Sequence, residues 1–173
     1  MEKKLVVVDA EDNKIGEISK AEAHRKGVLH RAFSVFLYHD GKLLLQQRAF
    51  GKYHSGGLWA NTCCSHPTTE DICGEAKKRL FEEVGIKCDK LQEIFKFTYF
   101  SKFADDLFEH EIDHVFVGDY DGQFEINKNE VNDMQWITFE QIEREMKETP
   151  KKFATWFLIA APKVLKYLKK QQK

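Results

Sequence analysis

The sequence predicts a single α+β domain in which a mixed β-sheet is sandwiched between helices. Several apolar and aromatic runs have the length and composition of strands. Other segments repeat their apolar residues at a helical spacing. The chain of 173 residues contains only three prolines and shows no linker or internal repeat, so we assign residues 1–173 to one domain.

The first third of the chain predicts a short strand and a hairpin. We expect Leu5–Val8 to be a strand and Ser19–His24 to be a short helix or turn. The runs His30–His39 and Lys42–Arg48 are rich in apolar residues, and Asp40-Gly41 between them is typical of a two-residue hairpin turn. These two runs are therefore expected to pair as antiparallel neighbours.

The middle of the chain predicts a loop followed by a helix. Glycines indicate a loop at Gly51–Gly57, and Leu58–His66 has room for a short strand. The segment Glu70–Val84 is helical in pattern, because its apolar residues recur every four positions, at Ile72, Ala76, Leu80 and Val84. Gly85 stands where helices commonly end.

The second half of the chain predicts further strands and two helices. The strand-like segments are Glu93–Phe103, Glu109–Asp119 and Met134–Ile137. Thr138 and Gln141 resemble a capping box that opens a helix running to Met146. The last helix covers Phe153–Lys170, and Pro162 predicts an interruption or kink within it.

Composition and charge argue against several classes of function. Hydrophobic residues make up 42% and charged residues 32%, and the formal net charge is −1, which does not favour a nucleic-acid-binding or polybasic membrane protein. The apolar run Leu5–Val8 is too short for a signal peptide, and no segment reaches the length of a transmembrane helix. We therefore expect a cytoplasmic protein whose four cysteines are thiols.

The segment Asn61–Pro67 carries the most informative residues. If it is extended, Cys64 and His66 face one side, while Cys63 points to the other. Cys63 is then a small buried hydrophobe, whereas Cys64 is a reactive thiol if a metal or cation lowers its pKa. A Cys-x-His pair alone is a weak signal, and a structural role remains the alternative.

A second group of residues predicts a metal site. Glu109 and Glu111 share one face of a strand, where like charges repel unless a cation lies between them or one is protonated; a solvent-facing edge strand is the alternative. His24 and His30 lie at the entrance to the first long strand, and either one alone is more often a surface or hydrogen-bonded histidine than a ligand. With His66, the set suits octahedral Mn²⁺, Mg²⁺ or Fe²⁺ better than a thiolate-rich zinc site, although Zn²⁺ is compatible.

The helical segment Glu70–Val84 matches part of the Nudix box. Aligned on Glu82–Ile86, the chain has the expected aliphatic residue at Leu80 and a glutamate at Glu70. It departs at three other positions of the box, which hold Cys64, Lys78 and Arg79. Arg79 replaces one glutamate of the metal-binding pair, so the scaffold resembles Nudix while the hydrolytic metal site is damaged.

This combination resembles the type 1 isopentenyl-diphosphate isomerases over nearly the whole chain. The matching segments are His30–Phe36, Leu43–Arg48, Asn61–Pro67, Glu109–Asp113 and Trp156-Phe157. The resemblance implies a Nudix-type mixed sheet with a core over 28–148 and a helix over 153–170 that completes the site. It also implies conversion of isopentenyl diphosphate to dimethylallyl diphosphate, in isoprenoid biosynthesis, by proton transfer through a carbocation-like intermediate.

The resemblance further implies roles for the residues of the site. A divalent metal (Mn²⁺, Mg²⁺ or Zn²⁺) would be held by His24, His30, His66, Glu109 and Glu111. Cys64 would be one acid/base, and Glu111, helped by Tyr99, would act on the opposite face of the substrate. Trp156 would stabilise the cation through its ring face, with an ordinary core tryptophan as the alternative.

The substrate implied by the resemblance is a small-molecule diphosphate. The basic positions that match the family's are Lys20, Arg48, Lys52 and Arg79. A second Mg²⁺ would arrive with the diphosphate, with Glu83 as its carboxylate. No nucleic-acid or membrane partner is expected, and the protein would be a monomer or a weak homodimer.

Two departures from the family affect loops. His54–Gly57 stands where the family often has aromatic-Pro-Gly, and Thr155 replaces a common proline, so these changes bear on loop order and substrate affinity.

Two other functions compete with isomerisation. One alternative is a Nudix hydrolase of nucleoside diphosphate derivatives, against which Arg79 argues. The other is a non-catalytic domain with Cys64 and His66 as zinc ligands, which leaves the carboxylates and basic residues unexplained.

Overall fold

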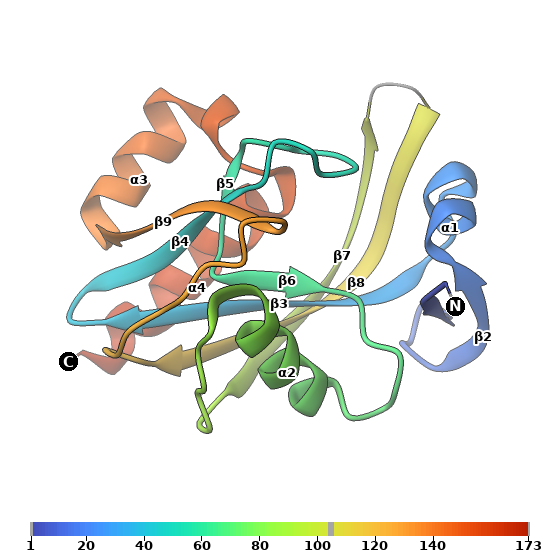
Figure 1. Cartoon of the computed structure of the whole chain (residues 1–173), viewed down its shortest axis with the longest axis horizontal. Helices are drawn as coiled ribbons and strands as arrows, with labels where there is room; N and C mark the ends of the chain where they lie inside the picture. Colours follow the sequence, from blue (N-terminus) through green and yellow to red (C-terminus); the bar gives the residue numbers. More distant parts are fainter. Residues whose placement is uncertain (1, 104–105, 173) are drawn as a thin grey trace.

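A curved mixed sheet organises the chain in a computed structural model, which describes residues 2–103 and 106–172 (Figure 1). Its central strand is β3 (His30–His39), which pairs in parallel with β8 (Leu107–Asp119) from His30↔Glu111 to Tyr38↔Asp119. The antiparallel neighbours of β3 are β1 (Lys4–Val8), β4 (Lys42–Arg48) and β6 (Cys63–Ser65). The parallel pairing lays the start of β3 beside the carboxylates of β8.

The remaining strands extend this sheet at its edges. β2 (Lys14–Ser19) pairs with β1, and β7 (Gln92–Phe103) pairs with β8. β5 (Trp59–Ala60) and β9 (Val131–Thr138) both pair with β4. Within the described part of the chain, nine strands therefore form one sheet.

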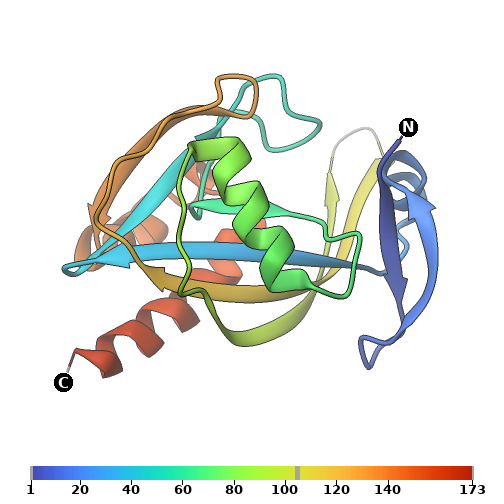
Figure 2. The ribbon, with the colours of Figure 1, turned by 60° about the horizontal axis from the view of Figure 1, so that its bottom comes forward.

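Helices cover both faces of the sheet, as Figure 2 shows. α2 (Ile72–Val84) lies on one face, while α3 (Phe139–Glu148) and α4 (Thr155–Gln171) lie on the other. The short helices are α1 (Lys20–Lys26), near β8, and the 3₁₀ turn η2 (Pro150–Lys152) before α4.

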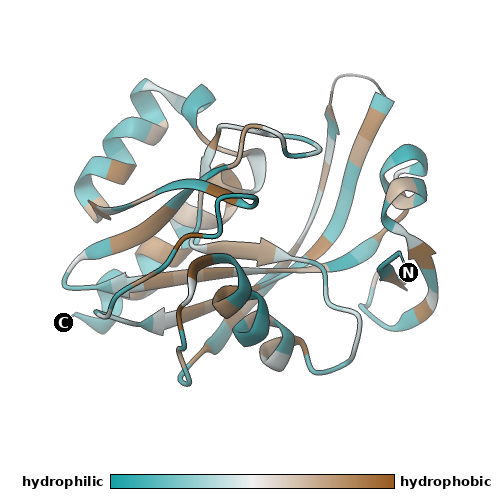
Figure 3. Ribbon diagram, viewed as in Figure 1, coloured by the Kyte–Doolittle hydropathy of each residue, from teal (hydrophilic) through white to brown (hydrophobic). Residues whose placement is uncertain are grey.

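The central strand contributes to both hydrophobic cores because successive side chains point to opposite faces of a sheet. Val35 belongs to the core beneath α2, which includes Leu80, while Phe36 belongs to the core beneath α4, which includes Phe157. Because helices cover both faces of the sheet, the sequence of β3 is a nearly continuous apolar run. In Figure 3 the hydrophobic residues are concentrated in the central strands of the sheet and in the part of α4 that faces it.

Several element predictions are confirmed. The hairpin strands β3 and β4 have the expected bounds, and Asp40 and Gly41 adopt the positive φ angles, 47° and 74°, of their turn. α2 begins at Ile72 rather than at Glu70, because Asp71 caps it by accepting a hydrogen bond from the Gly74 amide at 3.0 Å. It ends at Gly85 as expected.

Other predictions need correction. β2 was not expected, because its partly exposed edge sequence has no clear apolar alternation. The segment Leu58–His66, which was expected to have room for one short strand, holds two, β5 and β6, because Thr62 between them uses its side chain to accept from the Leu37 amide. α4 continues across Pro162 without interruption. Pro162 is exposed, so the carbonyl that loses its partner can be hydrated.

The described residues include no helix that is both long enough and apolar enough to cross a membrane. The fold is α+β in one domain, as predicted. It gathers the start of β3, the end of β6 and the first half of β8 close to α1 (Figure 1).

Candidate active site

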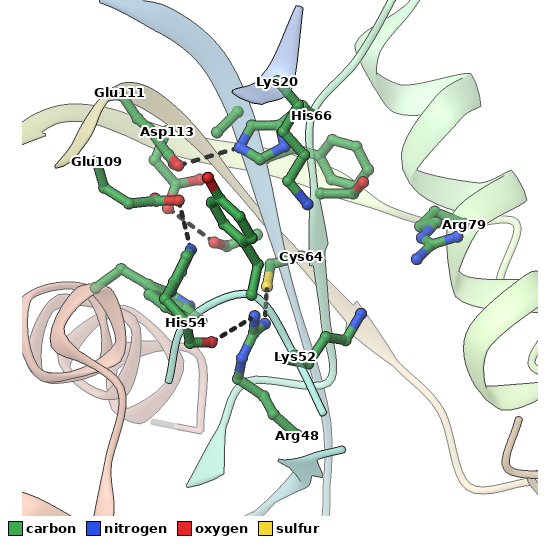
Figure 4. A pocket seen from close by; sticks show the side chains of 16 residues that line it. Lys20, Arg48, Lys52, His54, Cys64, His66, Arg79, Glu109, Glu111 and Asp113 are labelled. Atoms are coloured by element: carbon green, nitrogen blue, oxygen red, sulfur yellow. Dashed lines mark hydrogen bonds and ion pairs between the residues drawn. The ribbon is translucent and has the colours of Figure 1, made fainter. Parts of the chain in front are cut away.

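A pocket of about 590 Å³, part of it open to solvent, lies where these elements meet (Figure 4). The predicted residues that line it are Lys20, Arg48, Lys52, Cys64, His66, Arg79, Glu109, Glu111 and Trp156. Four other predicted residues, namely His24, His30, Tyr99 and Glu83, are buried and are not among its lining.

Three acidic residues form one wall of the pocket. Glu109, Glu111 and Asp113 alternate along β8, so their side chains project from the same face, and all three are buried. Burial, and then the charge of Glu109, raise the pKa of Glu111 well above its usual range. Burial opposes ionisation of Glu109 too, but hydrogen bonds with Glu111, His24 and His54 hold the pKa of Glu109 well below its usual range.

The predicted histidines meet this wall through their Nε2 atoms. His24 Nε2 lies 2.9 Å from Glu109 Oε1, and His66 Nε2 lies 3.1 Å from Glu111 Oε1. His30 Nε2 is 3.7 Å from Glu111 Oε1 and has no hydrogen-bond partner among the described residues. The structure therefore brings together the five residues predicted to hold a metal, which form overlapping groups of possible ligands.

The backbone sets the tautomers of two of these histidines. His24 Nδ1 donates to the Lys20 carbonyl, and His30 Nδ1 donates to the Val28 carbonyl, each at 2.8 Å. In the neutral ring the Nε2 atom then carries a lone pair that faces a carboxylate, so this arrangement needs either a proton or a cation between the two groups. Burial also lowers the pKa of His30 and, to a greater degree, the pKa of His66, so both favour the neutral form that binds metals. This donor set fits a divalent metal.

The adjacent cysteines face opposite sides of β6, as predicted. Cys64 lines the pocket, with Arg48 Nη1 3.8 Å from its sulfur. Cys63 is fully buried and donates to Glu83 Oε2 at 3.1 Å. Burial raises the pKa of Cys64 to about 12 against the opposing charge of Arg48. Burial therefore favours the protonated thiol over the thiolate.

Trp156 brings α4 into the site. Its Nε1 donates to Asn61 Oδ1 at 2.9 Å, which fixes the orientation of the indole ring. The Arg48 guanidinium lies 5.0 Å from the ring centroid, so this π-face attracts a cation in the absence of substrate.

Of the predicted basic residues, Arg48, Lys52 and Arg79 lie across the pocket from the acidic wall, whereas Lys20 extends into the pocket beside His66 (Figure 4). Glu130 forms ion pairs with both Lys52 and Arg79, the latter at 3.0 Å. Burial, followed by the charge of Lys52, lowers the pKa of Lys20. Such a cluster of cations, held partly by one carboxylate, is suited to an anionic group.

Two predicted residues contact the site differently from what was expected. Tyr99 donates its hydroxyl to Glu109 Oε2 at 3.1 Å, so any support it gives Glu111 is indirect. Glu83 accepts from Cys63 and lies 3.7 Å from Arg79 Nε, behind the pocket wall. Glu83 therefore reaches the predicted diphosphate position only through Arg79 in this conformation.

Sequence reasoning missed four residues of the site. Asp113 and Ser34 line the pocket and are hydrogen-bonded to each other at 2.8 Å, and burial raises the pKa of Asp113 to about 7. Glu130 joins two of the basic residues. His54 donates to Glu109 from a loop that the sequence marked only as unusual. The alternation that revealed Glu109 and Glu111 could also have indicated Asp113.

Comparison with known proteins agrees with this geometry. The NUDIX domain model matches residues 28–157. "Isopentenyl-diphosphate Delta-isomerase 2" of Aromatoleum aromaticum is 42% identical over 167 residues, which cover 95% of this chain and 88% of that protein. The "Isopentenyl-diphosphate Delta-isomerase" of Serratia proteamaculans is 46% identical over 160 residues, covering 91% and 89% respectively.

A solved structure supports the fold independently. DR0079 from Deinococcus radiodurans superposes with a TM-score of 0.69 at 20% identity, covering 85% of this chain and 90% of that one. At this identity the likeness concerns the fold alone.

Proposed function

Since the chain belongs to the NUDIX domain family and, within it, to the isopentenyl-diphosphate Delta-isomerases, we propose that Cys64 and Glu111 are its two proton-transferring groups. The enzyme converts isopentenyl diphosphate to dimethylallyl diphosphate in isoprenoid biosynthesis. The observation that carries the residue assignment is that Cys64 from β6 and Glu111 from β8 line one pocket, which also presents several cations.

The reaction needs one group to give a proton and another to take one. A proton is added to the terminal carbon of the alkene, which places positive charge on the neighbouring tertiary carbon. A proton then leaves the carbon on the other side of that centre, so the double bond moves and no proton is gained or lost overall. A partly exposed thiol and a buried carboxyl group at different positions around the pocket can perform these two transfers.

The proposed metal ligands are His24, His30, His66, Glu109 and Glu111, with Mn²⁺, Mg²⁺ or Zn²⁺ as the ion. A bound divalent cation would set the proton affinity of the carboxylate that it contacts. The support is that Nε2 atoms of His24 and His66 are directed at Glu109 and Glu111, and that Nε2 of His30 has no hydrogen-bond partner within residues 2–103 and 106–172.

Trp156 is proposed to stabilise the positive charge that develops on the substrate. Its ring already attracts the Arg48 guanidinium, so its π-face suits a cation, and Asn61 holds the indole in place. A low-polarity aromatic wall also limits the approach of water to the charged carbon.

The diphosphate is proposed to bind Lys20, Arg48, Lys52 and Arg79. Arg48, Lys52 and Arg79 line the side of the pocket away from the carboxylates, which separates the anion from the acidic wall, and Lys20 reaches into the pocket from beside His66. Glu130 would release Lys52 and Arg79 as the diphosphate takes its place. A second Mg²⁺ would accompany the diphosphate, with Glu83, which lies behind Arg79, as its carboxylate.

The remaining expectations are also proposals. We propose a cytoplasmic location, which suits the four cysteine thiols, and a small-molecule diphosphate rather than nucleic acid or a membrane as the partner. The monomeric or weakly dimeric state stays a prediction, to be measured by light scattering at several protein concentrations.

Turnover assays test this assignment against hydrolysis. We expect isomerisation of isopentenyl diphosphate, no phosphate release from nucleoside diphosphate derivatives, and loss of turnover by at least about a hundredfold in Glu111→Gln. Phosphate release without isomerisation would support the hydrolase instead. Full activity of Glu111→Gln would refute the role given to that carboxyl group.

A further inference from the structure

The loop between β4 and β5 has a defined shape in spite of its unusual sequence. Its base is closed by hydrogen bonds from the Arg48 amide to the Leu58 carbonyl at 2.9 Å and from the Gly57 amide to the Arg48 carbonyl at 3.0 Å. Gly57 has a φ of +79°, and a Cβ there would lie 2.7 Å from the Phe50 ring. The Phe50 ring therefore packs against the loop's own backbone, which only glycine permits at this position.

His54 is the residue of this loop that reaches the acidic wall. Its Nε2 lies 2.7 Å from Glu109 Oε1, and its Nδ1 lies 3.2 Å from Ser55 Oγ. The hydroxyl can donate to Nδ1, which leaves the Nε2 proton for Glu109. The ring is stacked on Phe103 with a centroid distance of 4.6 Å and meets the edge of Trp156 at 6.0 Å. The side chain is only 9% exposed.

The backbone of the same residue touches the basic side of the pocket. The His54 carbonyl accepts a hydrogen bond from Arg48 Nη2 at 3.3 Å. Lys52, two positions earlier on the loop, lines the pocket and pairs with Glu130. One residue thus contacts a carboxylate proposed to hold the metal and a cation proposed to hold the diphosphate.

We propose that His54 is a positioning residue that couples the divalent-metal site to the loop that binds the diphosphate. The inference rests on the proposed function, because it takes Glu109 as a metal ligand and Arg48 and Lys52 as diphosphate ligands. Hydrogen bonds to a ligating carboxylate orient it, and their loss typically weakens metal binding by about 10–100-fold. The same bond holds the loop over the pocket, so metal and diphosphate each stabilise the arrangement that the other needs.

His54→Phe separates the hydrogen bond from the aromatic packing. Phenylalanine retains a flat ring for Phe103 and Trp156 but removes both nitrogens. His54→Gln is the complementary variant, since its amide can still donate to Glu109. The matched control is His39→Phe, which removes a histidine bonded to a carboxylate, Asp119 at 2.8 Å, at the far end of β3.

The first measurement is hydrogen exchange of the amides of residues 50–57 in protein stripped of metal. We expect exchange about tenfold faster in His54→Phe than in wild type, near-normal exchange in His54→Gln and no change in this loop for His39→Phe. Because no metal is present, this result does not depend on turnover. Equal exchange in wild type and His54→Phe would overturn the proposed tether.

The second measurement is Mn²⁺ affinity by competition with a chelator, together with the kinetic constants. His54→Phe should bind Mn²⁺ about tenfold more weakly and show a raised KM for isopentenyl diphosphate even at saturating metal, with partial rescue in His54→Gln. Unchanged affinity and unchanged KM in His54→Phe would overturn the coupling. If the wild-type protein lacks isomerase activity while His54→Phe still exchanges faster than wild type, the proposed function is wrong and the tether stands.

Discussion

Two neighbouring cysteines on β6 have opposite environments, which makes them a sensitive test at the scale of single residues. Cys64→Ala removes a proton-transferring group from the pocket, so turnover should fall by about 10²–10⁴-fold while the His/Glu set still binds metal. Metal content and turnover, measured on the same preparation, check this result. Loss of metal together with activity would favour Cys64 as a metal ligand instead.

Cys63→Ala is the paired control. It removes a buried thiol that donates to Glu83, so we expect a stability loss of about 1 kcal/mol and turnover within a few-fold of wild type. Urea unfolding measures the first quantity and the isomerase assay measures the second. A defect in turnover equal to that of Cys64→Ala would show that the assigned faces of β6 are wrong.

At this scale, alternation along strands was the most informative sequence signal. It placed Glu109 with Glu111, and Cys64 with His66, because the side chains of an extended chain alternate in direction. His54 and Glu130 could not be found in this way. Their partners lie 55 and 78 residues away in the chain, at Glu109 and Lys52, and loop shape decides these contacts.

At the scale of secondary-structure elements, local signals predicted the hairpin β3–β4 and the helix α2 closely. Both depend on turn and cap residues that act within a few positions, namely Asp40-Gly41, Asp71 and Gly85. β2 and the division into β5 and β6 depend on pairing across the sheet. There the Thr62 side chain replaces a ladder hydrogen bond, and no local pattern signals this.

The cap of α2 gives a prediction for this scale. Asp71→Ala removes the acceptor of the Gly74 amide, so the free energy of unfolding should fall by about 1 kcal/mol. Lys78→Ala, at an exposed position of the same helix, should change the free energy by less than about 0.5 kcal/mol. Urea titration of both variants checks this, and equal stabilities would contradict the assigned cap.

At the scale of the whole molecule, the metal ligands come from separate parts of the fold. His24 is on α1, His30 begins β3, His66 follows β6, and Glu109 and Glu111 are on β8. Their convergence depends on the parallel pairing of β3 with β8, which no short sequence window contains. The residue types suggested that these side chains share a metal, and the resemblance to a family supplied the long-range arrangement.

Such a site should link metal binding to global stability. A metal at one hundred times its Kd should add about 2.7 kcal/mol to the free energy of unfolding, because the unfolded chain does not assemble the ligands. We therefore expect the Tm to fall by several degrees when EDTA replaces excess Mn²⁺. Glu109→Gln/Glu111→Gln should show little of this shift. An unchanged Tm in wild-type protein would contradict the metal site.

The most direct test of the central claim follows the protons themselves. Purified protein is incubated with isopentenyl diphosphate and Mg²⁺ in D₂O, and the products are followed by proton NMR. The proposed exchange through Cys64 and Glu111 predicts dimethylallyl signals with deuterium in the newly formed methyl group. Folded, metal-loaded protein that yields neither isomerised product nor deuterium uptake would contradict the claim.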